Sequence, residues 1–219
     1  MSMLLCPSMM CADFACLAEE VRLLEEAGAD IFHVDIMDGN FVPNFGMGIQ
    51  DIQYIAKAAS KPIDVHLMIK NPGRYVNRFA ELGAKIIYIH PEADIHAART
   101  LQTIIDAGAS PAIAINPGTS VETIRPLLHL TDYILVMTVN PGFAGQKYLS
   151  FVDEKINNLL ELKSQYEYRI MIDGACSPQK IEELSAKGVD GFVLGTAALF
   201  GKDRPYHAII QELRKRSPL

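Results

Sequence analysis

A repeated local pattern restricts the fold of this chain more than any other feature. Gly28, Gly83, Gly108 and Gly188 each follow a segment of helical character and precede a short apolar run. A glycine in that position suits the left-handed residue just past the end of an α-helix. Several of the runs are rich in isoleucine and valine, which is typical of strands buried on both faces of a sheet.

The spacing of these glycines indicates how many units the chain contains. They lie 55, 25 and 80 residues apart, which is close to multiples of a unit of about 27 residues. The chain length of 219 residues divided by eight is also about 27. One helix and one strand fill such a unit, so eight units predict a single-domain (β/α)8 TIM barrel spanning residues 1–219. An open doubly wound sheet is less favoured, because the chain has no early G-x-G-x-x-G.

The elements of this barrel can be placed along the chain. We predict strands at residues 3–7, 31–35, 63–67, 86–90, 111–115, 133–138, 168–173 and 191–195. We predict helices at residues 14–27, 49–59, 73–82, 96–107, 120–129, 150–165, 178–187 and 205–216. Asp13, Ser120 and Ser177 stand at predicted helix starts and suit the N-cap position, and Pro178 suits a first helical turn.

The composition argues against several classes of protein. Hydrophobic residues make up 49% of the chain and charged residues 21%, as in ordinary globular domains. A net charge of −6 without clustered lysine and arginine argues against a nucleic-acid partner. No apolar stretch approaches the roughly 20 residues of a membrane span, and residues 1–10 lack the features of a secretory signal. We therefore expect a cytoplasmic protein without a membrane partner.

The cysteines are too few to form a disulfide framework. Cys6, Cys11, Cys16 and Cys176 are the four in the chain. The spacing of the first three could suggest a metal site, but their apolar neighbours favour buried free thiols.

Titratable side chains gather at the C-terminal ends of the predicted strands, where barrels of this type place their chemistry. The period of two along a strand puts His33 and Asp35 on one face, and likewise Asp64 and His66. We expect His33, Asp35, His66 and Asp173 to converge at one mouth. Two imidazoles and two carboxylates suit one divalent metal ion, with Zn²⁺ favoured and Fe²⁺, Co²⁺ or Mn²⁺ as alternatives. The competing interpretation is four separately satisfied polar groups at the barrel rim.

The remaining histidines carry weaker signals. His90 ends a strand but precedes Pro91, so we expect it to hydrogen-bond only its own loop. His96, His129 and His207 lie on predicted helices and are expected at the surface.

Three loops rich in small residues follow neighbouring strands. They are residues 140–146, Gly174-Ala175 and Gly195-Thr196-Ala197. Backbone N–H groups of such loops bind phosphate in this fold, and glycine lets the backbone approach an anion closely. We expect a phosphorylated small molecule held by backbone amides and a metal rather than by a basic patch.

Three methionines fall at or just after strand ends, at Met37, Met68 and Met137. One interpretation is core filling. The other is an apolar lid that excludes water from a reactive intermediate.

Several segments together resemble the ribulose-phosphate 3-epimerase family. They are residues 7–14, 33–44, 64–68, 136–146 and 172–174, and the resemblance extends over nearly the whole chain. It implies an isomerase that inverts C3 of a ketose phosphate, with Asp35 and Asp173 as the acid–base pair. It implies a divalent metal on His33, Asp35, His66 and Asp173. The residues implied at the substrate and its phosphate are Ser8, His66, Gly142, Phe143, Ala144, Gly145, Gly174, Ala175, Gly195 and Thr196.

The substrate within this family is a separate question. Cys11, Ala144, Ala175 and Thr196 depart from the usual pentulose enzymes. Several of these changes are similar to the allulose-6-phosphate 3-epimerase branch. We expect D-ribulose 5-phosphate and D-xylulose 5-phosphate, with D-allulose 6-phosphate giving D-fructose 6-phosphate as the alternative. A non-catalytic sugar-phosphate-binding barrel is a more remote hypothesis, because a binder has no need of both carboxylates. A decarboxylase relative would carry a lysine among the acidic strand ends, which is absent here. The resemblance also implies association into a homo-oligomer.

Overall fold

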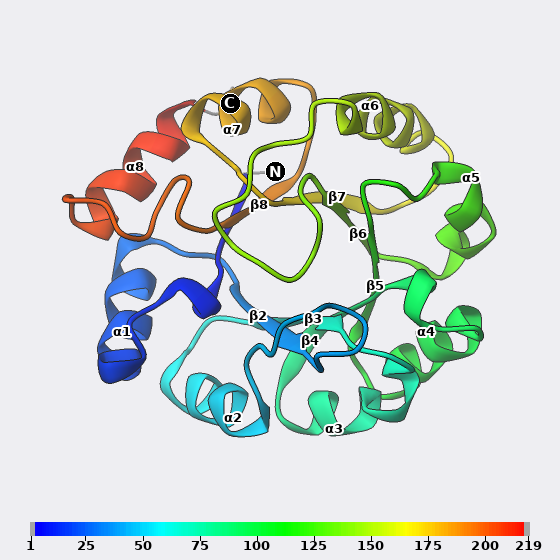
Figure 1. Ribbon diagram of the computed structural model, residues 1–219. Coiled ribbons are helices and arrows are strands. Elements are labelled where there is room, and N and C mark those ends of the chain that lie inside the picture. The colour runs from blue at the N-terminus through cyan, green and yellow to red at the C-terminus, as the bar shows by residue number, and fades with distance from the viewer. Residues whose placement is uncertain (1–2, 217–219) are drawn as a thin grey trace.

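The computed structural model describes residues 3–216, which form a ring of parallel strands inside a ring of helices (Figure 1). The sheet has eight strands in the order β1-β8-β7-β6-β5-β4-β3-β2. Ser8, just after β1, bridges to His33 in β2 and so brings the two ends of this order together. The predicted (β/α)8 barrel is therefore confirmed. The strands are β1 (Leu4–Pro7), β2 (Phe32–Met37), β3 (Ile63–Met68), β4 (Ala84–Ile89), β5 (Ser110–Ile115), β6 (Tyr133–Met137), β7 (Arg169–Asp173) and β8 (Gly191–Leu194).

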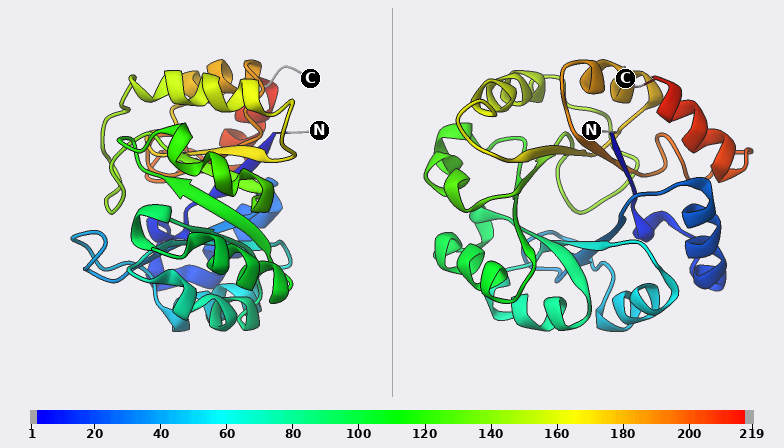
Figure 2. Two further views of the ribbon diagram at one scale, coloured as in Figure 1. Left: turned by 90° about the vertical axis from the view of Figure 1, so that its right-hand side faces the viewer. Right: turned by 180° about the vertical axis from the view of Figure 1, so that it is seen from behind.

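A helix follows each strand and packs on the outside of the barrel. The long loops after β2 and β6 project from one end of it (Figure 2). The helices are α1 (Leu17–Ala27), α2 (Ile49–Ala58), α3 (Val76–Glu81), α4 (Ala97–Asp106), α5 (Val121–Ile124), α6 (Val152–Leu162), α7 (Pro178–Ala186) and α8 (Tyr206–Arg216).

Three predicted helices are interrupted, although their positions are right. The segment 14–27 begins with a 3₁₀ turn at Phe14–Cys16, where Asp13 accepts a hydrogen bond from the Ala15 N–H. The segment 73–82 divides into a 3₁₀ turn at Pro72–Arg74 and α3. The segment 120–129 changes from α5 to a 3₁₀ turn at Arg125–Leu130. Pro126 explains this last change, because proline lacks an N–H and its ring clashes with a helical carbonyl four residues earlier.

The four repeated glycines have the conformation that their positions predict. Their φ angles are +97° at Gly28, +99° at Gly83, +76° at Gly108 and +102° at Gly188. Side chains rarely adopt this region, so glycine ends these helices at the least conformational cost.

Side chains alternate between the two faces of each strand, so the apolar core has two separate parts. Val65 and Leu67 of β3 belong to the large apolar cluster between strands and helices. Asp64 and His66 of the same strand lie on the other face, inside the barrel, which follows from the period of two. Below the mouth the barrel interior is packed with apolar side chains: Cys6, Ile31, Ile86, Tyr88, Ala112, Ala114, Leu135, Met137, Val139, Met171 and Val193. The polar strand ends therefore stand on a solid apolar floor.

All four cysteines are free thiols, as expected. Cys6 and Cys176 are buried and Cys11 is partly buried. Cys16 is exposed, so the expectation of burial is wrong there, because it lies at the open turn before α1. Within residues 3–216, we find no helix that is both long and apolar enough to cross a membrane.

Candidate active site

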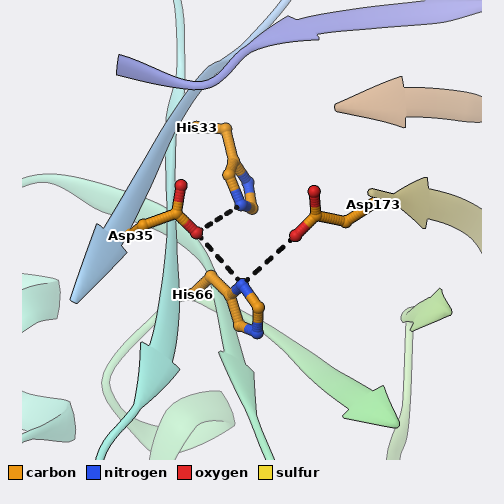
Figure 3. Close-up of side chains that lie close together, drawn as sticks. All are labelled: His33, Asp35, His66 and Asp173. Atoms are coloured by element: carbon orange, nitrogen blue, oxygen red, sulfur yellow. Dashed lines mark hydrogen bonds and ion pairs between the residues drawn. The ribbon is translucent and has the colours of Figure 1, made fainter. Parts of the chain in front are cut away.

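Four side chains from three strands meet at the mouth of the barrel. His33 and Asp35 come from β2, His66 from β3 and Asp173 from the end of β7 (Figure 3). One ligand atom of each lies within 4.8 Å of the corresponding atoms of the other three. Strand register explains half of this arrangement, because Asp35 is paired directly with His66 across β2 and β3. The structure thus brings together the four residues that the sequence indicated.

The distances in this cluster fit a metal ion. Oδ1 of Asp35 lies 3.3 Å from Nε2 of His33 and 3.2 Å from Nδ1 of His66. Oδ2 of Asp173 lies 3.7 Å from Nδ1 of His66. A tetrahedral ion with ligand bonds of about 2.0–2.1 Å needs neighbouring donor atoms about 3.4 Å apart. The four side chains form a group that could hold a metal ion.

The charges in the cluster also suit a cation. Nε2 of His33 is buried and makes no hydrogen bond within residues 3–216. Burial opposes protonation of His33, but Asp64 and Asp35 outweigh it and raise its pKa well above the usual value. The carboxylates therefore stabilise positive charge at this point, and a divalent cation supplies such charge directly.

The two carboxylates have opposite pKa shifts. Burial, together with the negative charge of Asp35, raises the pKa of Asp173 to about 7. Burial opposes ionisation of Asp35 as well, but His33 and His66 hold its pKa below the usual value. Paired titratable groups whose environments separate their pKa values are typical of acid–base sites.

Neighbouring polar groups fix the orientation of the cluster. Ser8 donates a 2.7 Å hydrogen bond to Oδ2 of Asp35. Oδ1 of Asp64 lies 2.6 Å from Nδ1 of His33. Sequence analysis placed Asp64 on the inner face but gave it no role, although His33 and Asp64 are directly paired across β2 and β3.

His90 differs from its sequence-based interpretation. It is fully buried, and its Nε2 lies 2.8 Å from Nε2 of His66, so it does not serve its own loop alone. His96, His129 and His207 are exposed on helices or at their ends, as expected.

A cavity of about 250 Å³ opens above the cluster, a size that suits a small molecule. Asp35 and Asp173 both line it, whereas His33 and His66 are fully buried and do not. Among the lining residues, all of them in the described part of the chain, there is no lysine or arginine. The expected substrate and phosphate residues other than His66 all line this cavity: Ser8, Gly142, Phe143, Ala144, Gly145, Gly174, Ala175, Gly195 and Thr196.

Two consecutive residues after β7 have positive φ angles. Gly174 has φ +110°, and a Cβ there would lie 2.6 Å from Cγ2 of Val139. Ala175 follows with φ +48°, which costs a non-glycine residue about 1–2 kcal/mol. Both residues line the cavity, and glycine at position 174 lets the backbone approach a ligand closely.

The three methionines also line the cavity. Met37 and Met68 form a small buried apolar group with Val42 at the mouth. Met137 belongs instead to the packed barrel interior. Met37 and Met68 thus line the cavity from a separate apolar cluster, while Met137 forms part of the floor.

Two mouth loops are joined by a contact that sequence analysis did not indicate. Nδ2 of Asn44, in the loop after β2, donates a 2.7 Å hydrogen bond to the carbonyl of Gly142, in the loop after β6. A Cβ on Gly142 would lie 3.1 Å from Cβ of Val42, so the loops are also closely packed. The residues are 98 positions apart, and no local pattern predicts such a contact.

The molecule is a (β/α)8 barrel whose mouth holds a cluster able to bind a metal, with a pair of carboxylates, above a packed apolar interior. This arrangement is that of a barrel enzyme. A profile of the Ribulose-phosphate 3 epimerase family matches residues 4–200. The chain belongs to this family, and it is accordingly an isomerase that acts as an epimerase.

Individual relatives agree with this assignment. The chain is 42% identical over 202 residues to the ribulose-phosphate 3-epimerase of Aquifex aeolicus (strain VF5), covering 91% of each. It is 39% identical over 218 residues to that of Escherichia coli (strain K12), covering 96% of this chain and 94% of the relative. The solved structure of 3-hexulose-6-phosphate synthase from Salmonella typhimurium matches with a TM-score of 0.72 at 17% identity, covering 98% of each chain. At that identity the likeness shows the fold alone.

Proposed function

We propose that this chain interconverts D-ribulose 5-phosphate and D-xylulose 5-phosphate by inverting C3. The observation that carries the proposal is the pair Asp35 and Asp173, which come from β2 and β7 and face each other across the cluster (Figure 3). The names of relatives about 40% identical over nearly the whole chain support the choice of substrate.

Inversion at C3 needs two proton carriers on opposite faces of the substrate. One carboxylate takes the proton from C3, and the electron pair of that bond moves into a C2–C3 double bond as charge develops on the C2 oxygen. The other carboxylic acid then delivers a proton to C3 from the opposite face. The pKa of Asp173 is raised by burial and by Asp35, while His33 and His66 lower that of Asp35, so Asp173 holds a proton more readily than Asp35 does.

A divalent metal ion is part of the proposal, with Zn²⁺ favoured over Fe²⁺, Co²⁺ or Mn²⁺. His33, Asp35, His66 and Asp173 would hold it, and the mixture of imidazole and carboxylate donors supports this choice. When bound, such an ion supplies Lewis-acid stabilisation of negative charge on substrate oxygens.

The rest of the cavity would position the substrate and keep it dry. Backbone N–H groups of the loops at Gly142–Gly145, Gly174-Ala175 and Gly195-Thr196 would hold the phosphate, since no basic side chain lines the described cavity. Met37 and Met68 would cover the reacting carbons and exclude water from the enediolate.

The alternative substrate is D-allulose 6-phosphate, which would give D-fructose 6-phosphate. One observation favours considering it: the residues that depart from the usual pentulose enzymes, Cys11, Ala144, Ala175 and Thr196, all line the cavity. The test is the ratio of kcat/KM for ribulose 5-phosphate to kcat/KM for allulose 6-phosphate, measured on one preparation. We expect the ratio to exceed one. A ratio below one would assign the hexulose phosphate instead, and turnover of neither would contradict the proposed reaction.

A further inference from the structure

A chain of three side chains leads from the candidate metal cluster out of the barrel. Nε2 of His66 lies 2.8 Å from Nε2 of His90, and both residues are fully buried. Oε2 of Glu92 lies 3.5 Å from Nδ1 of His90. That nitrogen is buried and makes no hydrogen bond within the described part of the chain, which leaves it open to the electrostatic influence of Glu92.

The short contact between His66 and His90 links their protonation patterns. Two imidazole nitrogens at 2.8 Å share one proton, so one donates and the other accepts. If Nε2 of His66 carries the hydrogen, its Nδ1 has a free lone pair directed at Asp35 and Asp173. In the opposite pattern His90 carries the shared hydrogen on Nε2, and Nδ1 of neutral His90 is bare.

Glu92 distinguishes between these two patterns. A carboxylate attracts an N–H at Nδ1 of His90 and repels a bare lone pair there. A hydrogen on Nδ1 leaves Nε2 of neutral His90 as an acceptor, and that acceptor requires the hydrogen on Nε2 of His66. The tautomer of a histidine is set in this way by the partner of its other nitrogen.

Glu92 is itself held in place by the neighbouring loop. Its Oε1 accepts a 3.0 Å hydrogen bond from the Asn116 N–H and another from the hydroxyl of Thr119. Lys155 donates to the carbonyls of Asn116 and Pro117 at 2.6 and 2.8 Å, so this loop is anchored to α6. The negative charge of the Glu92 carboxylate is therefore held in a fixed position beside His90.

His33, the other histidine of the cluster, is oriented by one direct contact with a carboxylate. Asp64 lies 2.6 Å from Nδ1 of His33 without an intermediate, which leaves Nε2 to face the cluster. The two histidines thus present different ring nitrogens to the same point, Nε2 from His33 and Nδ1 from His66. Each needs its own partner on the opposite nitrogen.

We propose that His90 and Glu92 are positioning residues that hold His66 as the Nε2–H tautomer, so that its Nδ1 is a ready ligand for the metal. The inference rests on the proposed metal site and deepens it. It assigns a function to a buried histidine and to a glutamate at the surface, both outside the four ligands.

The direct test is ¹⁵N NMR of the imidazole nitrogens in the whole protein, both metal-free and loaded with Zn²⁺. In the Zn²⁺-loaded protein we expect hydrogen on Nδ1 of His90 and on Nε2 of His66, and a Zn²⁺-dependent shift at Nδ1 of His66. In the metal-free protein Asp35 and Asp173 attract a hydrogen to Nδ1 of His66 and so oppose this pattern. Hydrogen on Nε2 of His90 in the Zn²⁺-loaded protein would overturn the inference.

The second test is the Zn²⁺ affinity of Glu92→Gln, measured by competition with a chromophoric chelator. Glutamine keeps the shape but can donate to Nδ1 of His90, so we expect affinity to fall about 10- to 100-fold. Glu122→Gln is the matched control, because it removes the same charge at an exposed glutamate that pairs with Arg125. An affinity of Glu92→Gln equal to that of this control would overturn the inference.

The two proposals fail in different ways. Failure of the unaltered protein to bind Zn²⁺ would contradict the metal site itself. Normal Zn²⁺ binding with no effect of Glu92→Gln would contradict only the positioning role. If Glu92→Gln does not fold, as judged by circular dichroism, the tautomers of the unaltered protein decide the matter.

Discussion

The two oxygens of the Asp35 carboxylate contact different partners. Its Oδ2 accepts a hydrogen bond from Ser8, while its Oδ1 faces His33 and His66. The group is 4% exposed yet lines the cavity, so it can meet a ligand while its orientation is held from behind. A buried carboxylate needs such partners, because burial of an unpaired charge is costly.

Substitution of either carboxylate tests the proton-transfer roles. We expect Asp35→Asn and Asp173→Asn each to lower kcat by at least about 10²–10⁴-fold, because an amide cannot exchange the proton. Circular dichroism should show an unchanged fold. Asp203→Asn, at an exposed position before α8, is the control and should keep full activity. Full activity in either cavity variant would contradict the two-carboxylate mechanism.

Removal of metal tests the candidate ligands as a group. Exhaustive chelation should abolish epimerisation, and added Zn²⁺ or Mn²⁺ should restore it. Zn²⁺ at 100 times its Kd should also stabilise the native state by about 2.7 kcal/mol, which a rise in Tm would report. Activity that persists after elemental analysis confirms metal loss would contradict the role of the ion.

Among the secondary-structure elements, two of the repeated glycines are followed by an aspartate whose side chain hydrogen-bonds the sheet. Asp30 stands two residues after Gly28, and its side chain accepts a 2.7 Å hydrogen bond from the N–H of Leu5 in β1. Asp190 stands two residues after Gly188 and accepts a 2.7 Å bond from the N–H of Ile170 in β7. In both places an aspartate just before one strand satisfies a backbone donor of the neighbouring strand. Equivalent units thus solve the same hydrogen-bonding problem in the same way.

The contact between mouth loops leads to a prediction at this scale. Asn44→Ala removes the hydrogen bond to the Gly142 carbonyl, which is worth about 1 kcal/mol. We expect kcat/KM to fall about fivefold and proteolysis within residues 140–149 to become faster, with Tm nearly unchanged. Lys70→Ala, at an exposed position in the loop after β3, is the control. If Asn44→Ala changes neither kcat/KM nor the cleavage rate, the contact does not hold the loop.

At the scale of the whole molecule, barrel closure depends on how tightly the last strand fits between its neighbours. Gly191 begins β8 and is paired with Leu4 of β1 on one side and Met171 of β7 on the other. A Cβ at this position would lie 2.8 Å from Cβ of Leu4 and 2.5 Å from Cε of Met171. The Met171 side chain can move, but the Leu4 Cβ moves only with its strand. A side chain at position 191 would therefore push two strands apart.

Gly191→Ala tests this close fit. Overpacking of this kind costs about 1–3 kcal/mol, so urea unfolding should show a loss of stability in that range. Gly118→Ala is the matched control, because a Cβ there meets no atom within 4 Å. That control should change stability by less than about 0.5 kcal/mol. Equal stability of the two variants would contradict the account of closure.

The fold and the inner face of each strand follow from the amino-acid sequence alone. Helix-ending glycines, their spacing and the strand period of two are local properties, and local geometry converts them into a barrel with His33, Asp35, His66 and Asp173 pointing inward. The break at Pro126 is also a local effect, because the missing N–H and the ring of proline cause it. The expected burial of Cys16 was wrong, because its exposure depends on how the turn before α1 packs, which spacing does not encode.

Which side chains support the site becomes clear only in the folded barrel. The contact of His90 with His66 depends on side-chain direction across two adjacent strands, and the bond from Asn44 to Gly142 joins loops 98 residues apart. Gly191 likewise looks like an ordinary strand residue until β1 and β7 approach it from both sides. The physical reason is common to all three. Secondary structure fixes a residue's face, whereas its partner is fixed only when the barrel closes and brings distant segments into contact.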